Sequence, residues 1–265
     1  MSEPVVVSRQ GAVATLMLNR PDALNTLDFA MMDALVAAVA DVAADNALRV
    51  VLLGGAGKHF MAGGDLRTFA GELTKSRADR QAGFTQTIGR LHSAIELLQR
   101  MPHVVVARVH GAVAGFGLSL VAACDLVIAA DSAYFASAYR HIGLTPDGGM
   151  SWTLPRIVGL RKAMEILLLG ERFDAQQALQ LGLVNRVVTA VDLDATVDGV
   201  VRALVTGPTL ALRNAKRLLR QSSAHTLSEH LDAESRSFGE CAATPDFEEG
   251  IAAFLEKRPP QFGRG

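Results

Sequence analysis

The chain has 265 residues, of which 49% are hydrophobic and 20% are charged, values typical of a folded globular protein with an ample core. The formal net charge of −1 argues against nonspecific binding of nucleic acid, which needs a surplus of Lys and Arg against the phosphates. The length fits one large domain, or one domain with a helical appendage.

Cysteine usage and the apolar runs indicate the class of protein. Cys124 and Cys241 stand far apart and in no metal-ligand spacing, so we expect two reduced thiols and no metal site. Residues 1–4 show no signal pattern, and no apolar run approaches ~20 residues. These features predict a soluble, cytoplasmic protein.

The first hundred residues predict strands and helices in alternation. Residues 5–7 and 13–18 are typical of paired strands. Asp28 is a candidate N-cap for a helix with apolar residues at helical spacing. A strand is expected over 49–54 and a helix over about 81–100.

The segment before that second helix, residues 71–80, is polar and has few apolar anchors. The sequence therefore predicts a mobile surface segment there.

Two glycine-rich turns, residues 59–66 and 111–119, each follow a β-branched run and lead into a segment that could be helical. Glycine lets a backbone come close to a ligand or to a neighbouring element. A helix that begins at such a turn directs unpaired N–H groups and the positive end of its dipole forward. Two converging turns would form a pocket for developing negative charge on an oxygen.

Strands over 104–109 and 126–130 continue the alternation and predict an α/β fold with parallel strands. After about residue 186 the pattern is helical only. We therefore predict a core over 1–190 and a C-terminal helical region over 191–265. The helices expected there are 192–205, 208–222, 227–242 and 246–257.

Six segments in order resemble the crotonase, or enoyl-CoA hydratase/isomerase, superfamily over nearly the whole chain. They are residues 19–27, 60–66, 111–125, 143–149, 154–159 and 178–184. The resemblance implies a crotonase (ClpP-like) superhelix of ββα turns with a C-terminal helical region. It also implies a homotrimer or a dimer of trimers, and an acyl-CoA thioester as substrate. No separate cofactor is implied, since coenzyme A is part of that substrate.

The resemblance also assigns roles to residues. By position, the backbone N–H groups of Gly64 and Phe116 would form the oxyanion hole for the thioester carbonyl oxygen. The resemblance implies that the substrate-binding residues are Ala23, Leu24, Ala62, Asp65, Leu66 and Tyr139.

Two positions depart from the hydratases of this superfamily, which carry two glutamates that activate a water. The matching residues here are Ser119 and Tyr139. Neither side chain is a carboxylate, and neither suits paired acid–base work at neutral pH. Ser119 is most simply a small residue at a tight packing point, and Tyr139 an apolar wall of the pocket.

Asp147, in the stretch Thr-Pro-Asp-Gly-Gly over 145–149, resembles the single acid/base of Δ3,Δ2-enoyl-CoA isomerases and of the phenylacetate-pathway epoxide isomerase. One carboxylate would take a proton from C2 of a 3-enoyl-CoA and return it at C4. An apolar surrounding would raise its pKa toward the working range. The other interpretation of Asp147 is a turn former that caps a helix near 149–157.

Alternatives to an isomerase remain. One is an enoyl-CoA hydratase of fatty-acid or aromatic degradation. Another is an enzyme resembling 4-chlorobenzoyl-CoA dehalogenases, in which His92 and Asp147 would act together. Taken alone, His92 is an amphipathic-helix residue without a partner.

A different class is a catalytically lapsed member that binds CoA or RNA. The residues relevant to this alternative are four cations that form a stripe on one predicted helix: Arg213, Lys216, Arg217 and Arg220. Such a stripe is typical of a solvated face or of a neighbour of CoA phosphate, and the near-neutral net charge disfavours nucleic acid.

Overall fold

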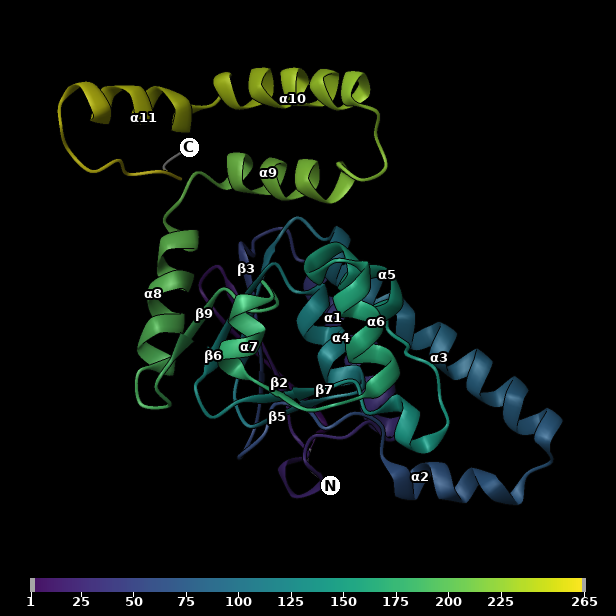
Figure 1. The fold of residues 1–265 in the computed structure, drawn as a ribbon. Helices are drawn as coiled ribbons and strands as arrows, with labels where there is room; N and C mark the ends of the chain where they lie inside the picture. The colour runs from purple at the N-terminus through teal and green to yellow at the C-terminus, as the bar shows by residue number, and fades with distance from the viewer. Residues whose placement is uncertain (1–2, 264–265) are drawn as a thin grey trace.

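A six-stranded sheet forms the centre of the computed structural model, which describes residues 3–263 (Figure 1). β1 and β2 form an antiparallel hairpin, and every later pair of neighbours in this sheet is parallel. In spatial order the strands are β1 (Val5–Gln10), β2 (Val13–Leu18), β3 (Val50–Gly55), β4 (Val104–Val109), β6 (Leu126–Ala130) and β9 (Arg186–Val188).

A second sheet has three short strands in the order β5-β7-β8. β5 follows β4 after a two-residue turn, so the chain passes directly from the large sheet into the small one. The strands are β5 (Ala112–Ala114), β7 (Tyr134–Ala136) and β8 (Phe173–Asp174).

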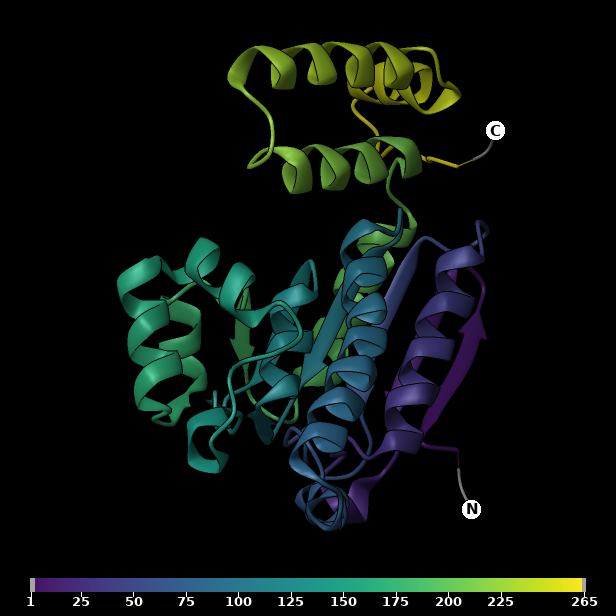
Figure 2. The ribbon, with the colours of Figure 1, turned by 90° about the vertical axis from the view of Figure 1, so that its right-hand side faces the viewer.

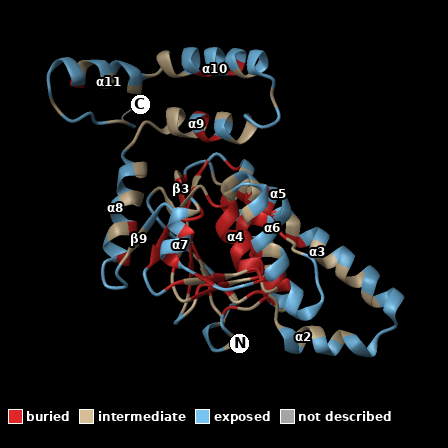
Figure 3. Cartoon of the chain, viewed as in Figure 1, coloured by how far each residue is buried: buried red, intermediate tan, exposed pale blue. Residues whose placement is uncertain are grey.

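Helices cover both faces of the large sheet because its inner strands are apolar on both sides. Val51 and Val105 belong to the core under α1 (Phe29–Ala44) and α3 (Arg77–Arg100), which pack side by side (Figure 2). Their chain neighbours Val50 and Val106 point the other way and pack against α8 (Leu193–Val205). Buried residues concentrate in these layers and in α4 (Phe116–Ala123), which is buried along its whole length (Figure 3).

Shorter helices connect these layers. They are η1 (Pro21–Ala23), α2 (Leu66–Gly71), η2 (Glu72–Thr74), η3 (Tyr139–Ile142), α5 (Met150–Val158), α6 (Leu160–Leu169) and α7 (Ala175–Gln180).

The last three helices, α9 (Thr209–Gln221), α10 (Leu227–Ala242) and α11 (Pro245–Leu255), lie together and project from the body (Figures 1 and 2). α8 lies beyond the predicted boundary at residue 190 yet packs on β3, β4 and β6. The projecting part therefore begins with α9.

Most predicted elements are confirmed. The structure has the paired strands, the strands predicted over 49–54, 104–109 and 126–130, and the four C-terminal helices. Each lies within a few residues of its predicted place. Asp28 caps α1 by accepting a hydrogen bond from the Met31 N–H. None of the helices formed by residues 3–263 has the length and apolar character needed to cross a membrane.

Residues 71–80 lie at the surface, as predicted, but most of them are helical. This stretch holds the end of α2, the turn η2 and the first residues of α3. α3 begins four residues earlier than predicted because Ser76 caps it, accepting a hydrogen bond from the Asp79 N–H. The cap is a local polar signal, and a search for apolar periodicity does not detect it.

Candidate active site

The two glycine-rich turns meet after β3 and β5. The Met61 N–H donates to the Ala112 carbonyl at 3.0 Å, and the Ala114 N–H donates to the Met61 carbonyl at 2.9 Å. Gly63 and Gly115 adopt φ values of +86° and +52°. A Cβ on Gly115 would stand 3.3 Å from the Gly63 Cα, so glycine is what allows the two backbones to come this close.

The backbone N–H groups of Gly64 and Phe116 are left without a protein acceptor, as far as residues 3–263 show. Leu27 donates to the Gly63 carbonyl and accepts from the Asp65 N–H, both at 2.8 Å, so the Gly64 N–H between these bonds is unpaired. Phe116 is the first residue of α4, where helix N–H groups have no partner within the helix. Two free donors and a helix N-terminus favour an oxygen that carries negative charge.

A cavity of about 360 Å³ opens beside these two donors. Phe69 of α2 packs edge-on against Phe84 of α3 in its wall, with ring centroids 5.1 Å apart. Across the described part of the chain, Asp147 is the one residue lining this cavity that has a carboxyl group. Other apolar side chains in the wall are Leu27, Met32, Leu66, Ile88, Ile142 and Leu144.

The Asp147 carboxyl lies half-buried on the turn between η3 and α5. The Tyr139 hydroxyl donates to its Oδ1, with 2.5 Å between the oxygens. Burial raises the pKa of Asp147, and the hydrogen bond from Tyr139 partly offsets that rise. Tyr139 is 8% exposed, and burial together with the nearby carboxylate raises the pKa of its phenol. The phenol therefore stays protonated and remains a donor at neutral pH.

The backbone around Asp147 is fixed by two side chains from other helices. Ser119 of α4 donates from Oγ to the Asp147 carbonyl at 2.9 Å, and the Gly148 N–H donates to His92 Nε2 of α3 at 3.1 Å. Gly148 has φ +58°, and a Cβ there would stand 2.7 Å from the Ser119 Cβ and 2.9 Å from the Phe116 ring. The turn that carries the carboxyl thus lies directly against the residue that supplies one of the free donors.

These contacts correct three interpretations made from the sequence. Asp147 does not cap the next helix with its side chain, because α5 has Gly149 at its N-cap and no side-chain hydrogen bond there. His92 has a partner, the Gly148 N–H. Tyr139 is more than an apolar wall, since its hydroxyl binds the carboxylate. The sequence shows no local pattern for these pairings, because the partners are 8 to 56 positions apart.

Of the six residues predicted to contact the substrate, three line the cavity, and Asp65, like the two residues around η1, does not. Ala62, Leu66 and Tyr139 line the cavity. Ala23 and Leu24 lie outside its wall on the loop around η1, where Leu24 is 45% exposed. Contact of these two residues with a bound ligand stays a prediction.

Asp65 has a structural role that the sequence indicated in part. Its side chain accepts hydrogen bonds from the N–H groups of Arg67 and Thr68 and so caps α2. It also pairs with Arg20 at 3.0 Å, and Arg20 pairs in turn with Asp28. The hydrogen bond from Arg20 and those from the backbone hold the pKa of Asp65 below its usual value against the opposing effect of burial. The Asp65 carboxylate therefore stabilises the local fold through the cap of α2 and the ion pair with Arg20.

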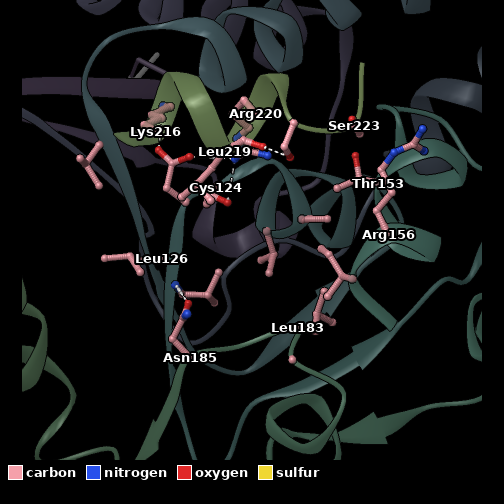
Figure 4. A pocket seen from close by; sticks show the side chains of 18 of the residues that line it. Cys124, Leu126, Thr153, Arg156, Leu183, Asn185, Lys216, Leu219, Arg220 and Ser223 are labelled. Carbon is pink, nitrogen blue, oxygen red and sulfur yellow. Dashed lines mark hydrogen bonds and ion pairs between the residues drawn. The ribbon is translucent and has the colours of Figure 1, made fainter. Parts of the chain in front are cut away.

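Three of the four cations in the stripe on α9 contact the body of the protein, and the fourth, Arg217, is exposed. Lys216 is 8% exposed and pairs with Asp125 at 2.7 Å, and Arg220 pairs with the same carboxylate at 2.8 Å. Figure 4 shows both cations directed at the end of α4, beside a cavity of about 700 Å³. None of the predicted site residues lines that second cavity. These two cations join the projecting helices to the body.

Sequence reasoning missed Phe69, Phe84 and Ile142 as cavity residues. Phe69 and Phe84 lie on either side of the stretch 71–80, on α2 and α3. Two aromatic side chains on either side of a polar stretch could have indicated two helices that are held together by contact between the rings.

Comparison with known proteins identifies the family. A sequence profile described as Enoyl-CoA hydratase/isomerase matches residues 8–265. The 1,2-epoxyphenylacetyl-CoA isomerase of Escherichia coli K12 is 35% identical over 263 residues, covering 99% of each chain. The short-chain-enoyl-CoA hydratase of Clostridium acetobutylicum is 30% identical, covering 96% of this chain and 95% of that protein.

Solved structures agree on the fold. The crystal structure of an enoyl-CoA hydratase from Mycobacterium smegmatis superposes with a TM-score of 0.90 at 35% identity, covering 98% of this chain and 99% of that one. The superposition therefore covers nearly the whole chain. The chain has the crotonase fold and belongs to the enoyl-CoA hydratase/isomerase family.

Proposed function

We propose that this protein is an enoyl-CoA isomerase that moves a double bond through an enolate, with Asp147 as its single acid/base. Members of its family act on acyl-CoA thioesters. The observation that carries the proposal is one carboxyl group beside two unpaired backbone donors in an apolar cavity. No cofactor is proposed, since coenzyme A is part of the substrate.

In this proposal the Gly64 and Phe116 N–H groups hold the thioester oxygen. When a proton leaves C2 of a 3-enoyl-CoA, the electron pair of the C–H bond delocalises onto that oxygen and gives a dienolate. The two donors and the N-terminus of α4 stabilise this charge more strongly than they stabilise the neutral carbonyl.

Asp147 carries the proton in both directions. Its carboxylate removes the proton from C2, and the resulting carboxylic acid returns the proton to C4. The dienolate supplies the electron pair for the new C4–H bond, and the double bond moves from C3=C4 to C2=C3. At the end Asp147 is again a carboxylate and the substrate has neither gained nor lost atoms, so one acid/base is sufficient. Its pKa, raised by burial, brings the two protonation states closer in energy at neutral pH.

A hydratase is the second candidate, because enzymes with that name are among the relatives. Hydration with two glutamates needs a second carboxylate on the water. The matching side chains here are Ser119 and Tyr139, and Tyr139 already donates to Asp147. This arrangement favours isomerisation.

The two candidates differ in their products. We expect the purified protein to convert 3-enoyl-CoA to 2-enoyl-CoA, as observed by NMR, and to hydrate crotonyl-CoA slowly, because no second carboxylate lines the described cavity. Fast hydration together with slow isomerisation would contradict the proposal and favour the hydratase.

We further propose a closed trimer or dimer of trimers. The projecting helices expose Phe238 at 74%, Phe254 at 81% and Leu255 at 73%, more apolar surface than a solvated appendage needs. Head-to-tail association of each chain with the next in a closed ring would cover it. Sedimentation velocity at micromolar concentration is expected to show a species of three or six chains, and a monomer alone would contradict this assembly.

A further inference from the structure

Tyr139 stands where the superfamily's hydratases have a glutamate, and its hydroxyl holds a carboxylate oxygen at 2.5 Å. We propose that Tyr139 is a positioning residue that fixes Oδ1 of Asp147, so that Oδ2 alone takes and returns the proton. This inference rests on the proposed isomerase function. It adds a second functional side chain, beside Asp147, to the proposed site.

The local backbone is built to direct this hydroxyl inward. Ala138, immediately before Tyr139, has φ +60°, a conformation that a residue with a Cβ rarely adopts. It turns the chain into η3 so that the Tyr139 side chain is buried rather than solvated. Strain of this kind persists where the surrounding structure requires it, and it is common at functional sites.

Ser119 completes the arrangement around Tyr139. Its Oγ lies 3.2 Å from the Tyr139 hydroxyl and donates to the Asp147 carbonyl at 2.9 Å. The hydroxyl of Tyr139 and the backbone of Asp147 are thereby held by one side chain that is 1% exposed. Within residues 3–263, Tyr139 is the one side chain that donates a hydrogen bond to the Asp147 carboxyl, and it does so at Oδ1.

This geometry has a chemical consequence for proton transfer. An O–H donor at 2.5 Å from a carboxylate oxygen is a strong, charge-assisted hydrogen bond. While that bond persists, a proton added to Asp147 goes to Oδ2. One oxygen then serves both C2 and C4, and the carboxyl does not rotate between the two steps.

The hydrogen bond also favours the ionised form of Asp147, which is the form that removes the proton from C2. The titratable groups that act on this carboxyl from neighbouring elements are His92 of α3 and Tyr139 of η3. His141 also lines the cavity, and its ring contacts the Gly170 carbonyl. Tyr139 contributes as a neutral donor because its own pKa is raised.

The test is the pH profile of kcat/KM for 3-enoyl-CoA in Tyr139→Phe. Loss of the donor destabilises the carboxylate, so the acid limb of the profile is expected to move up by about one pH unit. At the alkaline plateau we expect kcat to fall about tenfold with KM little changed, since the base is present but less well aligned. A purely structural role would lower the folded fraction without moving the limb.

Tyr134→Phe is the matched control. Tyr134, the other tyrosine of the chain, packs under Arg172 in the small sheet and does not line the cavity. Its variant is expected to keep the wild-type profile. If the acid limb of the profile does not shift in Tyr139→Phe, the inference is wrong. It is also wrong if that limb disappears in His92→Gln, because the group responsible for the limb would then be His92.

A second measurement does not depend on activity. In protein labelled with ¹³C at the Asp carboxyl groups, the Asp147 resonance is assigned from its loss in Asp147→Asn and titrated in the ligand-free protein. We expect its midpoint to rise in Tyr139→Phe and to stay unchanged in Tyr134→Phe. If wild-type protein fails to isomerise 3-enoyl-CoA but the midpoint rises, the proposed function fails while the hydrogen bond from Tyr139 stands. An unchanged midpoint contradicts the role of Tyr139 whatever the activity.

Discussion

The Asp147→Asn variant is expected to lose conversion of 3-enoyl-CoA to 2-enoyl-CoA by a factor of about 10² to 10⁴, the usual contribution of a positioned acid–base group. Asparagine is nearly isosteric with aspartate, and the Tyr139 hydroxyl can still donate to its amide oxygen. The contacts from Ser119 and to His92 use the backbone of the turn, so they survive the change. Folding and ligand binding should therefore persist while proton transfer fails.

Single-turnover kinetics with 3-enoyl-CoA measure the loss, and thermal unfolding with and without acyl-CoA verifies the fold and the binding. Asp131→Asn, at an exposed carboxylate after β6, is the matched control and should retain wild-type turnover. In heavy water the wild type should place deuterium at C4 to the extent that the carried proton exchanges. Near-normal turnover in a folded Asp147→Asn protein would move the acid/base elsewhere in the cavity.

The fold could be predicted well because its signals are local. Apolar strand runs, such as 104–109, and cap residues such as Asp28 act within a few positions of the element that they define. The glycine turns belong to the same class, since a left-handed backbone at Gly63 or Gly115 is a property of that position. Their meeting could be inferred from the order of the strands that precede them.

The contacts that define the chemistry could not be predicted in the same way. The bond from Tyr139 to Asp147 depends on the left-handed turn at Ala138, for which a residue with a Cβ gives no sequence signal. The contact of His92 with the Gly148 N–H joins a helix face to a turn 56 positions away. Each partner alone has an ordinary structural interpretation, and only the tertiary structure brings the two together.

The pairing of Lys216 and Arg220 with Asp125 was missed for a related reason. A row of cations on a helix is usually solvated, because removing charge from water is costly unless it is paired. Here one carboxylate, Asp125, pairs with both cations, and carbonyl groups at the end of α4 accept from Arg220. Whether these cations are paired or solvated therefore depends on Asp125, which is distant in the sequence and is not part of the helix pattern.

The oxyanion hole can be tested by removing one donor. Gly64→Pro has no backbone N–H at position 64, and the loss of one such donor typically lowers turnover by about 10² to 10³. The effect should fall on kcat more than on KM, because the donor binds the dienolate oxygen more strongly than the neutral carbonyl. Circular dichroism and thermal unfolding establish whether the variant keeps its fold.

Gly64→Ala separates the lost donor from added bulk. A Cβ at this position would stand 2.6 Å from the end of the Phe69 ring, so both variants place a Cβ against that ring. Only the proline variant lacks the N–H. If the free donor at Gly64 stabilises charge in the transition state, turnover should fall far more in Gly64→Pro than in Gly64→Ala. Equal losses would assign the effect to the displaced Phe69 ring and remove Gly64 from the oxyanion hole.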